Sequence, residues 1–312
     1  MTPATSRYCV PNELMASAVE EVTGSVAAGG GSATVSIVIL TRDEARNLPF
    51  ALASVKGWSE DIHVVDSGST DSTLDIARSA GARVCSHGWK GWGDQRNWAL
   101  DNCGLKHDWV LFLDADEQLT PASREEIVER TAAATPMCSG YCLQFDYVFL
   151  GARLRKAMHP HLRLVRRQAA RWQTVGAREF CNLPTDSPRI HARLIHEDHR
   201  GIGYFIDKLN RNASLEADAL WARRHGIRHR DADKSPGRAL RHRIWDLLER
   251  VLPPSLRALA FFSYRLLCCT DVRDGRTGVL FCFYFGFWFP LLIESKYQEL
   301  CRKAEGKKQR KT

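Results

Sequence analysis

The stretch Trp109-Val-Leu-Phe-Leu-Asp-Ala-Asp116 is an apolar run that ends in two carboxylates. Its apolar part predicts a strand buried on both faces, as in parallel sheets. Asp114 and Asp116 stand at i and i+2 just past that strand, so their side chains point the same way. Paired carboxylates are hard oxygen ligands that suit Mg²⁺ or Mn²⁺. Such pairs also occur in turns and helix caps, so this motif alone leaves both interpretations open.

The rest of the first half of the chain alternates between strand and helix patterns. In chain order these are strand 35–40, helix 43–55, strand 62–65, helix 73–80, strand 83–85, helix 94–102 and, after the quoted strand, helix 123–134. This alternation predicts an α/β fold, with a Rossmann-like, mostly parallel sheet flanked by helices. Ligands of such sheets bind beyond the carboxyl ends of the strands. Thr41, Asp66 and Asp114 fall at those ends, which indicates a shared site.

The loops after the first two strands carry polar residues suited to a nucleotide. Asp66 can accept hydrogen bonds from a base or ribose, and Gly68 lets the backbone approach a ligand. Asp71 fits the first turn of the next helix equally well, as an N-cap. Asp43 and Glu44 also fit a first turn, where carboxylates favour the helix dipole. We expect nucleotide-sugar contacts from Thr41, Arg42, Glu44, Asp66, Ser67, Arg96, Asp114 and Ala115.

The chain carries an excess of positive charge, with 44 Lys and Arg against 36 Asp and Glu. Basic residues cluster at 223–243 and in the tail at 302–311. Such clusters favour an anionic partner, namely nucleic acid, anionic lipid or a phosphorylated sugar, although a solvated surface accounts for 223–243 equally well. No nucleic-acid-reading motif accompanies them. Arg96 is a fork donor suited to a diphosphate, or else to a surface ion pair.

Two apolar segments, 258–269 and 279–293, set the last part of the chain apart. The second has no charge over fifteen residues, and its aromatic side chains cover every side of a helix, which makes a single buried face hard to arrange. At about 1.5 Å per residue it is roughly 22 Å long, short of a ~30 Å hydrocarbon core, and Pro290 lies inside it. We therefore expect a re-entrant or interfacial hairpin at a membrane surface. Two full spans or a pair of buried core helices are the alternatives.

Four ordered motifs carry a family resemblance: Ser36-Ile-Val-Ile-Leu-Thr-Arg-Asp-Glu44, Val64-Val-Asp-Ser-Gly-Ser-Thr-Asp71, Gly93-Asp-Gln-Arg-Asn97 and Leu111-Phe-Leu-Asp-Ala-Asp-Glu117. Together they resemble the family 2 glycosyltransferases of the GT-A fold. The closer resemblance is to the bacterial lipopolysaccharide core β-1,4-glucosyltransferase branch, and it runs from about Val35 to the C-terminus. It continues through Leu162-Arg-Leu-Val-Arg-Arg167, Arg171-Trp172 and Asp207-Lys-Leu-Asn-Arg211.

The resemblance implies an inverting, single-displacement transfer of a sugar. A carboxylate takes the proton of the acceptor hydroxyl, and a divalent metal (Mg²⁺ or Mn²⁺) held by Asp114 and Asp116 stabilises the departing diphosphate. In this branch the base lies in a Val-His-Glu triplet, which falls here at Ala177-Arg178-Glu179. Glu179 is the implied base, and Arg178 replaces the histidine. A cation beside Glu179 would weaken it as a base or pair with an anionic acceptor; a structural ion pair with Arg178 or another arginine is the alternative.

Further residues match the branch by spacing alone. His196 and Lys208 occupy such positions, although a lone histidine is more often a structural group. His159 and His161 depart from the branch pattern, and a second metal at this pair is the least favoured hypothesis. The ten cysteines form no CxxC pair, and we expect buried thiols of a reducing compartment.

These patterns predict three parts. Residues 1–33 form a flexible N-terminal segment that lacks the apolar run of a secretory signal. Residues 34–222 form the catalytic domain, with a nucleotide-sugar half at 34–135 and an acceptor half at 136–222. Residues 223–312 add a basic amphipathic helix, an apolar helical hairpin and a basic tail, a membrane-associated appendage.

The function that we expect is transfer of a hexose from a nucleotide-diphosphate sugar to a cell-envelope glycolipid such as lipopolysaccharide core. The enzyme would work at the cytoplasmic face of the bacterial inner membrane, as a peripheral or monotopic protein. Two alternatives stay open: a catalytically impaired nucleotide-sugar-binding protein and a sugar nucleotidyltransferase. The second would carry a Gly-rich loop with Arg and Lys near the first strand, which Thr41-Arg-Asp-Glu-Ala45 lacks.

Overall fold

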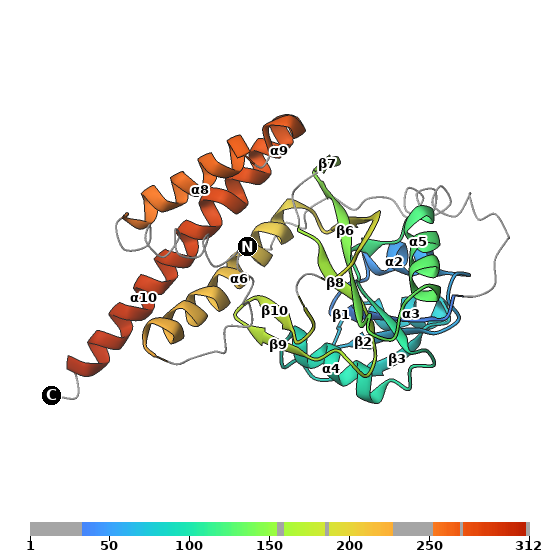
Figure 1. The fold of residues 1–312 in the computed structure, drawn as a ribbon. Coiled ribbons are helices and arrows are strands. Elements are labelled where there is room, and N and C mark those ends of the chain that lie inside the picture. Colours follow the sequence, from blue (N-terminus) through green and yellow to red (C-terminus); the bar gives the residue numbers. More distant parts are fainter. Residues whose placement is uncertain (1–32, 155–158, 185–186, 227–251, 269–270, 310–312) are drawn as a thin grey trace, which may run out of the picture.

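The computed structural model describes residues 33–154, 159–184, 187–226, 252–268 and 271–309 (Figure 1). Almost all of the predicted flexible segment at 1–33 lies outside these ranges, and so does most of the predicted basic amphipathic helix of the appendage. The described chain has a sheet covered by helices, with a group of long helices beside it.

One sheet organises the first two thirds of the chain. The strands are β1 Val35–Thr41, β2 Ile62–Asp66, β3 Arg83–Ser86, β4 Trp109–Asp114, β5 Glu117–Gln118, β6 Gly140–Phe149, β7 Ala152–Leu154, β8 His161–Arg166 and β11 Arg189–Glu197. Their order is β3-β2-β1-β4-β8-β6-β11-β5, with β7 on β6. Strands β1 to β4 pair in parallel, which confirms the predicted α/β sheet. Beyond β4 the sheet is mixed, because β8 runs antiparallel to both its neighbours while β6 and β11 are parallel.

Both faces of β1 and β4 are buried, which explains their mainly apolar sequences; within β1, the buried Ser36 donates its hydroxyl hydrogen bond to Asp61. Ile37, Ile39 and Leu111 belong to the core on one face of the sheet. Val38 and Phe112 belong to the core on the other face. Successive residues of a strand point to opposite faces, so a strand that lies between two helical layers needs an apolar residue at almost every position.

Helices cover the sheet as predicted, with shifted ends. They are α2 Leu48–Val55, α3 Thr73–Ser79, α4 Trp92–Asn102 and α5 Pro121–Ala132. The helix predicted from residue 43 begins only at Leu48, because Asp43 adopts a positive φ of 53° that no helix continues. α5 begins two residues before the predicted start, since Thr120 caps it by accepting a hydrogen bond from the Ser123 N–H at 3.2 Å.

A small antiparallel sheet of β9 Trp172–Val175 and β10 Arg178–Cys181 covers α4. Asn97 on α4 exchanges two hydrogen bonds of 2.9 Å with the Trp172 backbone. Gly93 lies so close to β9 that a Cβ there would be 3.0 Å from the Gln173 carbonyl carbon. This packing fixes β10 opposite the end of β4, and β10 carries Glu179.

The C-terminal helices form the appendage. α6 Gly201–Arg224 leads away from the sheet and packs along α10 Phe289–Gln309. α8 Pro254–Cys268 forms a hairpin with the helix that follows the short turn η1 Asp271–Asp274 (Figure 1). Two observations tie these elements together: Arg257 on α8 and Arg224 on α6 both reach Glu294, at 3.0 and 3.8 Å.

The helix that contains Pro290 continues without a break. α9 Gly275–Cys282, the π-helical turn η2 Phe283–Trp288 and α10 are continuous, and residues 275–306 form one helix of 32 residues. Pro290 lies two residues after the end of the π-helical turn, where the α-helical hydrogen-bond pattern is already altered, so it interrupts nothing further. The charge-free segment is therefore part of a longer helix, which by length and composition alone could cross a membrane, and only 22% of its most apolar window is buried.

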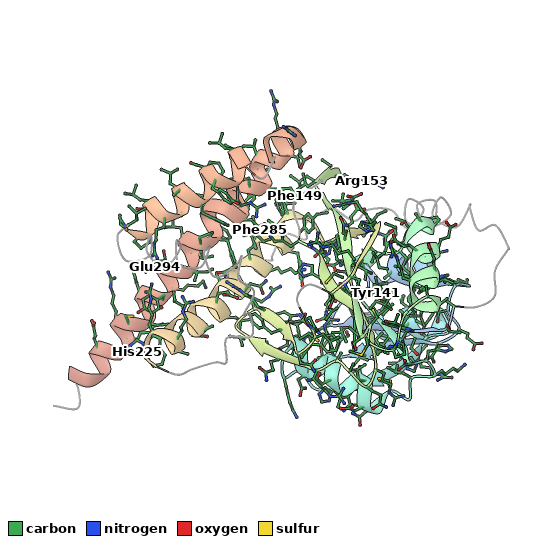
Figure 2. The ribbon with its side chains drawn as sticks, in the orientation of Figure 1. Tyr141, Phe149, Arg153, His225, Phe285 and Glu294 are labelled. Carbon is green, nitrogen blue, oxygen red and sulfur yellow. The ribbon has the colours of Figure 1, made fainter. Side chains whose placement is uncertain are left out.

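A third core cluster joins this helix to the sheet. Phe281 packs against Tyr147 and Phe149 of β6, with ring centroids 5.0 and 5.4 Å apart. Phe205 of α6 and Phe285 of the π-helical turn complete the contact. Figure 2 shows Phe149 and Phe285 at this junction, between the sheet and the long helices.

Candidate functional site

Asp66 organises the loops that follow β1 and β2. It is 3% exposed, and its Oδ2 accepts hydrogen bonds from the backbone N–H groups of Gly68 and Ser69, both at 2.9 Å. Its Oδ1 accepts one from Thr41 Oγ1 at 3.1 Å, and Ser67 Oγ donates to the Thr41 carbonyl at 3.1 Å. The two loops are thereby cross-linked. Nucleotide contacts from Thr41, Asp66 and Ser67 stay a prediction.

Asp71 and Asp43 have structural roles in the same loops. Asp71 accepts from the backbone N–H groups of Thr73, at 3.0 Å, and Ala45, at 3.1 Å. Burial alone would raise the pKa of Asp71, but the hydrogen bonds from Thr73 outweigh it and lower the pKa. Asp43 accepts from the Thr70 N–H at 2.7 Å. The helix-start interpretation of Asp71 is thus the one that the contacts support, whereas Arg42 lies exposed at the edge of the loop.

Asp114 ends β4 between two arginines. Arg163 of β8 donates from Nη2 to Oδ2 at 2.5 Å and from Nη1 to Oδ1 at 3.3 Å, and Arg96 of α4 donates to Oδ1 at 3.2 Å. Burial alone would raise the pKa of Asp114, but the charges of Arg163 and Arg96 outweigh it and hold the pKa well below its usual range. Asp114 is therefore an ionised carboxylate with both oxygens engaged. The neighbouring Ala115 is buried.

Arg96 connects Asp114 to Glu179. Its Nε lies 2.5 Å from Glu179 Oε2 and its Nη2 lies 3.2 Å from Oε1. Arg96 is 1% exposed, so it is not a surface residue, and its Nη1 has no hydrogen-bond partner among the described residues. A buried cationic N–H without a partner is costly, which marks the direction of Nη1 as a place for an anionic or polar ligand group.

Arg178 does not accompany Glu179, because neighbours along a strand point to opposite faces. It donates instead to Glu216 of α6, from Nε at 3.2 Å and from Nη2 at 3.1 Å. The cation beside Glu179 is Arg96, not Arg178. Arg178 thus joins the small sheet to α6.

Asp116 faces a second group of charged residues. Its Oδ2 lies 3.3 Å from Lys208 Nζ of α6 and 3.5 Å from His196 Nε2 of β11. Lys208 Nζ also lies 3.8 Å from Asp198 Oδ2, so the ammonium stands between two carboxylates. Burial alone would raise the pKa of Asp116, but the charges of His196 and Lys208 outweigh it and lower the pKa. Tyr147 stacks on His196, with ring centroids 4.8 Å apart.

Glu44 joins this group through Arg200. Arg200 Nη1 lies 2.7 Å from Glu44 Oε1, and Arg200 also donates twice to Asp198 at 2.7 Å. Asn47 donates to Glu44 Oε2 at 2.8 Å. Burial raises the pKa of Glu44 to about 7, although Arg200 acts against this rise. Glu44 is thus held inside the site by polar partners, as a group that titrates near neutral pH.

The site contains residues that the sequence analysis did not single out: Glu117, Arg163, Asp198 and Arg200. Glu117 accepts the Asp114 backbone N–H at 2.9 Å and binds Arg163 at 3.0 Å. Glu117 and Arg163 both lie within sequence motifs quoted above, so their charged side chains could have been proposed as site residues from those motifs. Asp198 and Arg200 lie in a loop after β11 and had no pattern of their own.

The residues fit a divalent cation at Asp116 better than at Asp114. Asp116 and Asp198 already converge on the ammonium of Lys208, and carboxylate oxygens suit Mg²⁺ or Mn²⁺. Asp114, by contrast, gives both oxygens to arginines. His161 begins β8 against the ring of Phe145, at 5.9 Å between centroids, and a second metal at His159 and His161 stays an untested hypothesis.

A separate pocket of about 390 Å³ lies along the seam between α4 and β9. It is lined by Lys90, Asp94, Asn97, Trp172, Gln173, Thr174 and Val175. None of these residues contributes a side chain to the contacts of Asp114 or Asp116 described above. The charged groups at the strand ends, and not this pocket, therefore define the candidate site.

Comparison with known proteins identifies the class. A glycosyl transferase family 2 model matches residues 36–192, which include β1 to β4 and the loops that carry Asp66, Asp114 and Asp116. The chain therefore belongs to glycosyl transferase family 2.

Relatives by sequence agree with this class. The chain is 32% identical to the lipopolysaccharide core biosynthesis glycosyltransferase LpsC of Rhizobium meliloti over 178 residues, which cover 54% of this chain and 59% of that protein. It is 42% identical to an uncharacterized glycosyltransferase of Rickettsia bellii over 93 residues, or 30% of this chain and 31% of that one. Each match spans less than two thirds of the relative.

Two solved structures of low identity align with part of this chain. Glucosyl-3-phosphoglycerate synthase of Mycobacterium tuberculosis aligns with a TM-score of 0.42 at 18% identity, over 69% of this chain and 86% of that one. The same enzyme in complex with Mn²⁺, uridine diphosphate and glucosyl-3-phosphoglycerate aligns with a TM-score of 0.41 at 18% identity, over 73% and 88%.

Proposed function

We propose that this chain transfers a hexose, with inversion, from a nucleotide-diphosphate sugar to a lipid-linked glycan acceptor of the bacterial cell envelope. The observation that carries this proposal is that Asp114 and Asp116 lie at the carboxyl end of the parallel strand β4, where Arg96 of α4 links Asp114 to Glu179 of β10. This is where α/β folds bind nucleotides. The lipopolysaccharide role of the Rhizobium relative supports the acceptor class.

Each charged residue has a proposed part in the transfer. Asp116 would hold a divalent metal, which would supply a Lewis acid for the leaving diphosphate. Arg96, whose Nη1 has no hydrogen-bond partner among the described residues, contacts the donor. Asp114, fixed by Arg163 and Arg96, orients the nucleotide-sugar. Arg163 balances the charges of Asp114 and Glu117, which makes these two neighbouring carboxylates compatible with folding.

Glu179 is proposed as the base. The acceptor hydroxyl gives its proton to Glu179, its oxygen bonds to the anomeric carbon, and the bond from that carbon to the diphosphate breaks, so the nucleotide diphosphate departs. Glu179 is 23% exposed and its oxygens bind Arg96. The arginine orients the carboxylate, and one of these hydrogen bonds must yield when the acceptor hydroxyl arrives.

A membrane surface is the proposed place of this reaction. The appendage exposes a series of large apolar side chains: Leu256, Leu259, Tyr264 and Leu267 on α8, and Val279, Leu280 and Phe283 on the long helix. Exposed apolar patches of this kind mark membrane or protein interfaces. Attachment at the inner membrane, on the side where nucleotide-sugars are made, would bring the site to an acceptor anchored in lipid.

The test is turnover of a panel of nucleotide-sugars by the full chain in detergent, with lipid extract as the acceptor and with or without Mn²⁺. We expect metal-dependent release of one nucleotide, reduced at least about 100-fold by Asp116→Ala. Asp75→Ala, an exposed carboxylate on α3, is the matched control and should keep full activity. Unchanged turnover in folded Asp116→Ala would refute the proposed role of Asp116.

A catalytically impaired nucleotide-sugar-binding protein is the second candidate, favoured by the double hydrogen bond of Arg96 to Glu179. Glu179→Gln separates the two. In an enzyme this variant still binds the nucleotide diphosphate but loses about 10²–10⁴-fold in transfer rate. In a binding protein, the wild type binds the nucleotide by calorimetry and transfers to no acceptor.

A further inference from the structure

A cluster of two thiols and an imidazole lies on one face of the sheet, away from the candidate site. It comprises His63 of β2, Cys85 of β3 and Cys103, the residue that ends α4. One potential ligand atom from each of the three lies within 4.8 Å of the other two. Cys85 and Cys103 are free thiols, and none of the three takes part in the proposed reaction.

His63 is prepared as a ligand on one side of its ring. Its side chain is fully buried, and its Nε2 lies 2.9 Å from Asp61 Oδ1. Nε2 therefore carries the proton that it donates to the carboxylate, which leaves Nδ1 with a lone pair. Nδ1 has no hydrogen-bond partner among the described residues. A buried polar atom without a partner requires an explanation, and a bound ion provides one.

Asp61 is held in place as an outer partner of that histidine. It accepts from Ser36 Oγ at 2.6 Å and from the Lys106 backbone N–H at 2.8 Å, both on Oδ2. A carboxylate that binds the far nitrogen of a histidine is the usual support for a metal-ligating imidazole, because it fixes the tautomer and the ring orientation.

We propose that His63 Nδ1, Cys85 Sγ and Cys103 Sγ bind one zinc ion. Two thiolates and a neutral imidazole balance the charge of Zn²⁺, which a buried site requires. Zinc prefers such sulfur and nitrogen ligands at about 2.0–2.3 Å, whereas Mg²⁺ and Mn²⁺ prefer oxygen, so this site and the carboxylate site select different metals. Cys85 is only partly buried, which leaves a path for the ion and for a fourth ligand such as water.

The ion would connect three elements that lead into the candidate site. β2 ends at Asp66, and α4 carries Arg96 seven residues before Cys103. A metal bridge between β2, β3 and the end of α4 would fix these elements relative to one another. The role is structural support and not chemistry. Because zinc binds the folded chain only, it should raise the Tm as its concentration rises.

Cobalt provides the first test, since Co²⁺ bound to thiolates shows charge-transfer absorption. The metal-free full chain should develop this absorption and saturate at one ion per chain. Cys103→Ser should abolish it, whereas Cys138→Ser, a thiol at the opposite face of the sheet, should keep it. Asp116→Ala should also keep it, which separates this site from the carboxylates. Absent bands in the wild type, or unchanged bands in Cys103→Ser, overturn the proposal.

A second test needs no substitution and so does not depend on the folding of a variant. Zinc should slow alkylation of Cys85 and Cys103 in the wild type, measured by peptide mass, and leave Cys138 unaffected.

A third test uses a variant of the outer carboxylate: Asp61→Asn should weaken zinc binding by about 10–100-fold. Equal alkylation with and without zinc overturns the proposal, and so does a disulfide between Cys85 and Cys103 in the freshly purified protein.

Discussion

The β1–β4 region and the C-terminal appendage are both rich in apolar residues, but they use them in opposite ways. In the first region, Ile37, Phe112 and Leu113 are fully buried between two helical layers. In the appendage, Leu267 is 78% exposed, and only 22% of the apolar window of the long helix is covered. An apolar sequence therefore predicts burial only where other helices or strands cover it. The comparison can be tested by making the same kind of substitution in each region and comparing the effects.

The largest difference is expected for one phenylalanine from each region. Phe112 packs under Arg96 and against Trp172, with 5.0 Å to each, and Phe112→Ala should lower the free energy of unfolding by about 3–5 kcal/mol. Phe283→Ala, at 39% exposure, should change it by less than about 1 kcal/mol. Denaturant unfolding in one detergent measures both. Equal losses would show that the appendage is packed as tightly as the sheet.

A smaller effect is expected from the buried Glu44. Its folded pKa of about 7 lies above the ordinary value of 4.5, so the folded state favours the protonated form. Its contribution to stability is complete below pH 4.5 and is lost as the pH rises through 7. Glu44→Gln should therefore gain up to about 2–3 kcal/mol relative to wild type between pH 4.5 and 8. Glu125→Gln, an exposed residue of α5, is the control. A pH-independent difference for Glu44→Gln would contradict this assignment.

A weaker effect should appear only when lipid is present. Replacing Leu259 and Leu267 by serine should reduce association with anionic vesicles by about tenfold or more, because partial burial of a leucine contributes about 1 kcal/mol. Stability in solution should stay nearly unchanged. Val128→Ser on α5 is the control, since it removes a side chain of 43% exposure from the other region. Vesicle binding that depends on Val128 as strongly would remove the distinction between the regions.

The smallest effect is expected at the ion pair between Arg178 of β10 and Glu216 of α6. The Arg178 side chain is 66% exposed, and its ion pair with Glu216 is screened by water. Arg178→Ala should lower the free energy of unfolding by no more than about 1 kcal/mol. The rate of sugar transfer should stay within a few-fold of wild type, because Arg96 and not Arg178 holds Glu179. A large loss of transfer would show that Arg178 acts in the reaction.

The sequence was most informative where one local rule decides the structure. The runs that became β1, β2 and β4 were recognisable because a strand covered on both faces needs an apolar residue at almost every position. The positions of Asp66 and Asp114 followed from strand ends. Asp198 and Arg200 could not be predicted, because their contacts with Glu44 and Lys208 join residues that are far apart in the chain. The side of β10 that Arg178 faces depended in the same way on where α6 lies.

The C-terminal helix shows the limit of length arguments. Counting only the charge-free residues 279–293 gave a helix too short for a bilayer, but charged and polar residues on both sides continue it to 32 residues. Pro290 counted against a full span, but the preceding π-helical turn accommodates it. Both outcomes depend on neighbouring turns and on α8, which a window of fifteen residues does not contain.

Because Phe281 packs on Tyr147, the long helix is part of the core behind the candidate site and not only a separate membrane anchor. Phe281 packs on Tyr147, Tyr147 stacks on His196, and His196 faces Asp116. A chain shortened before Gly275 to improve solubility would expose Tyr147 to water and weaken the packing behind His196 and Asp116. The apolar helix that such a truncation would remove therefore also supports the packing around Asp116.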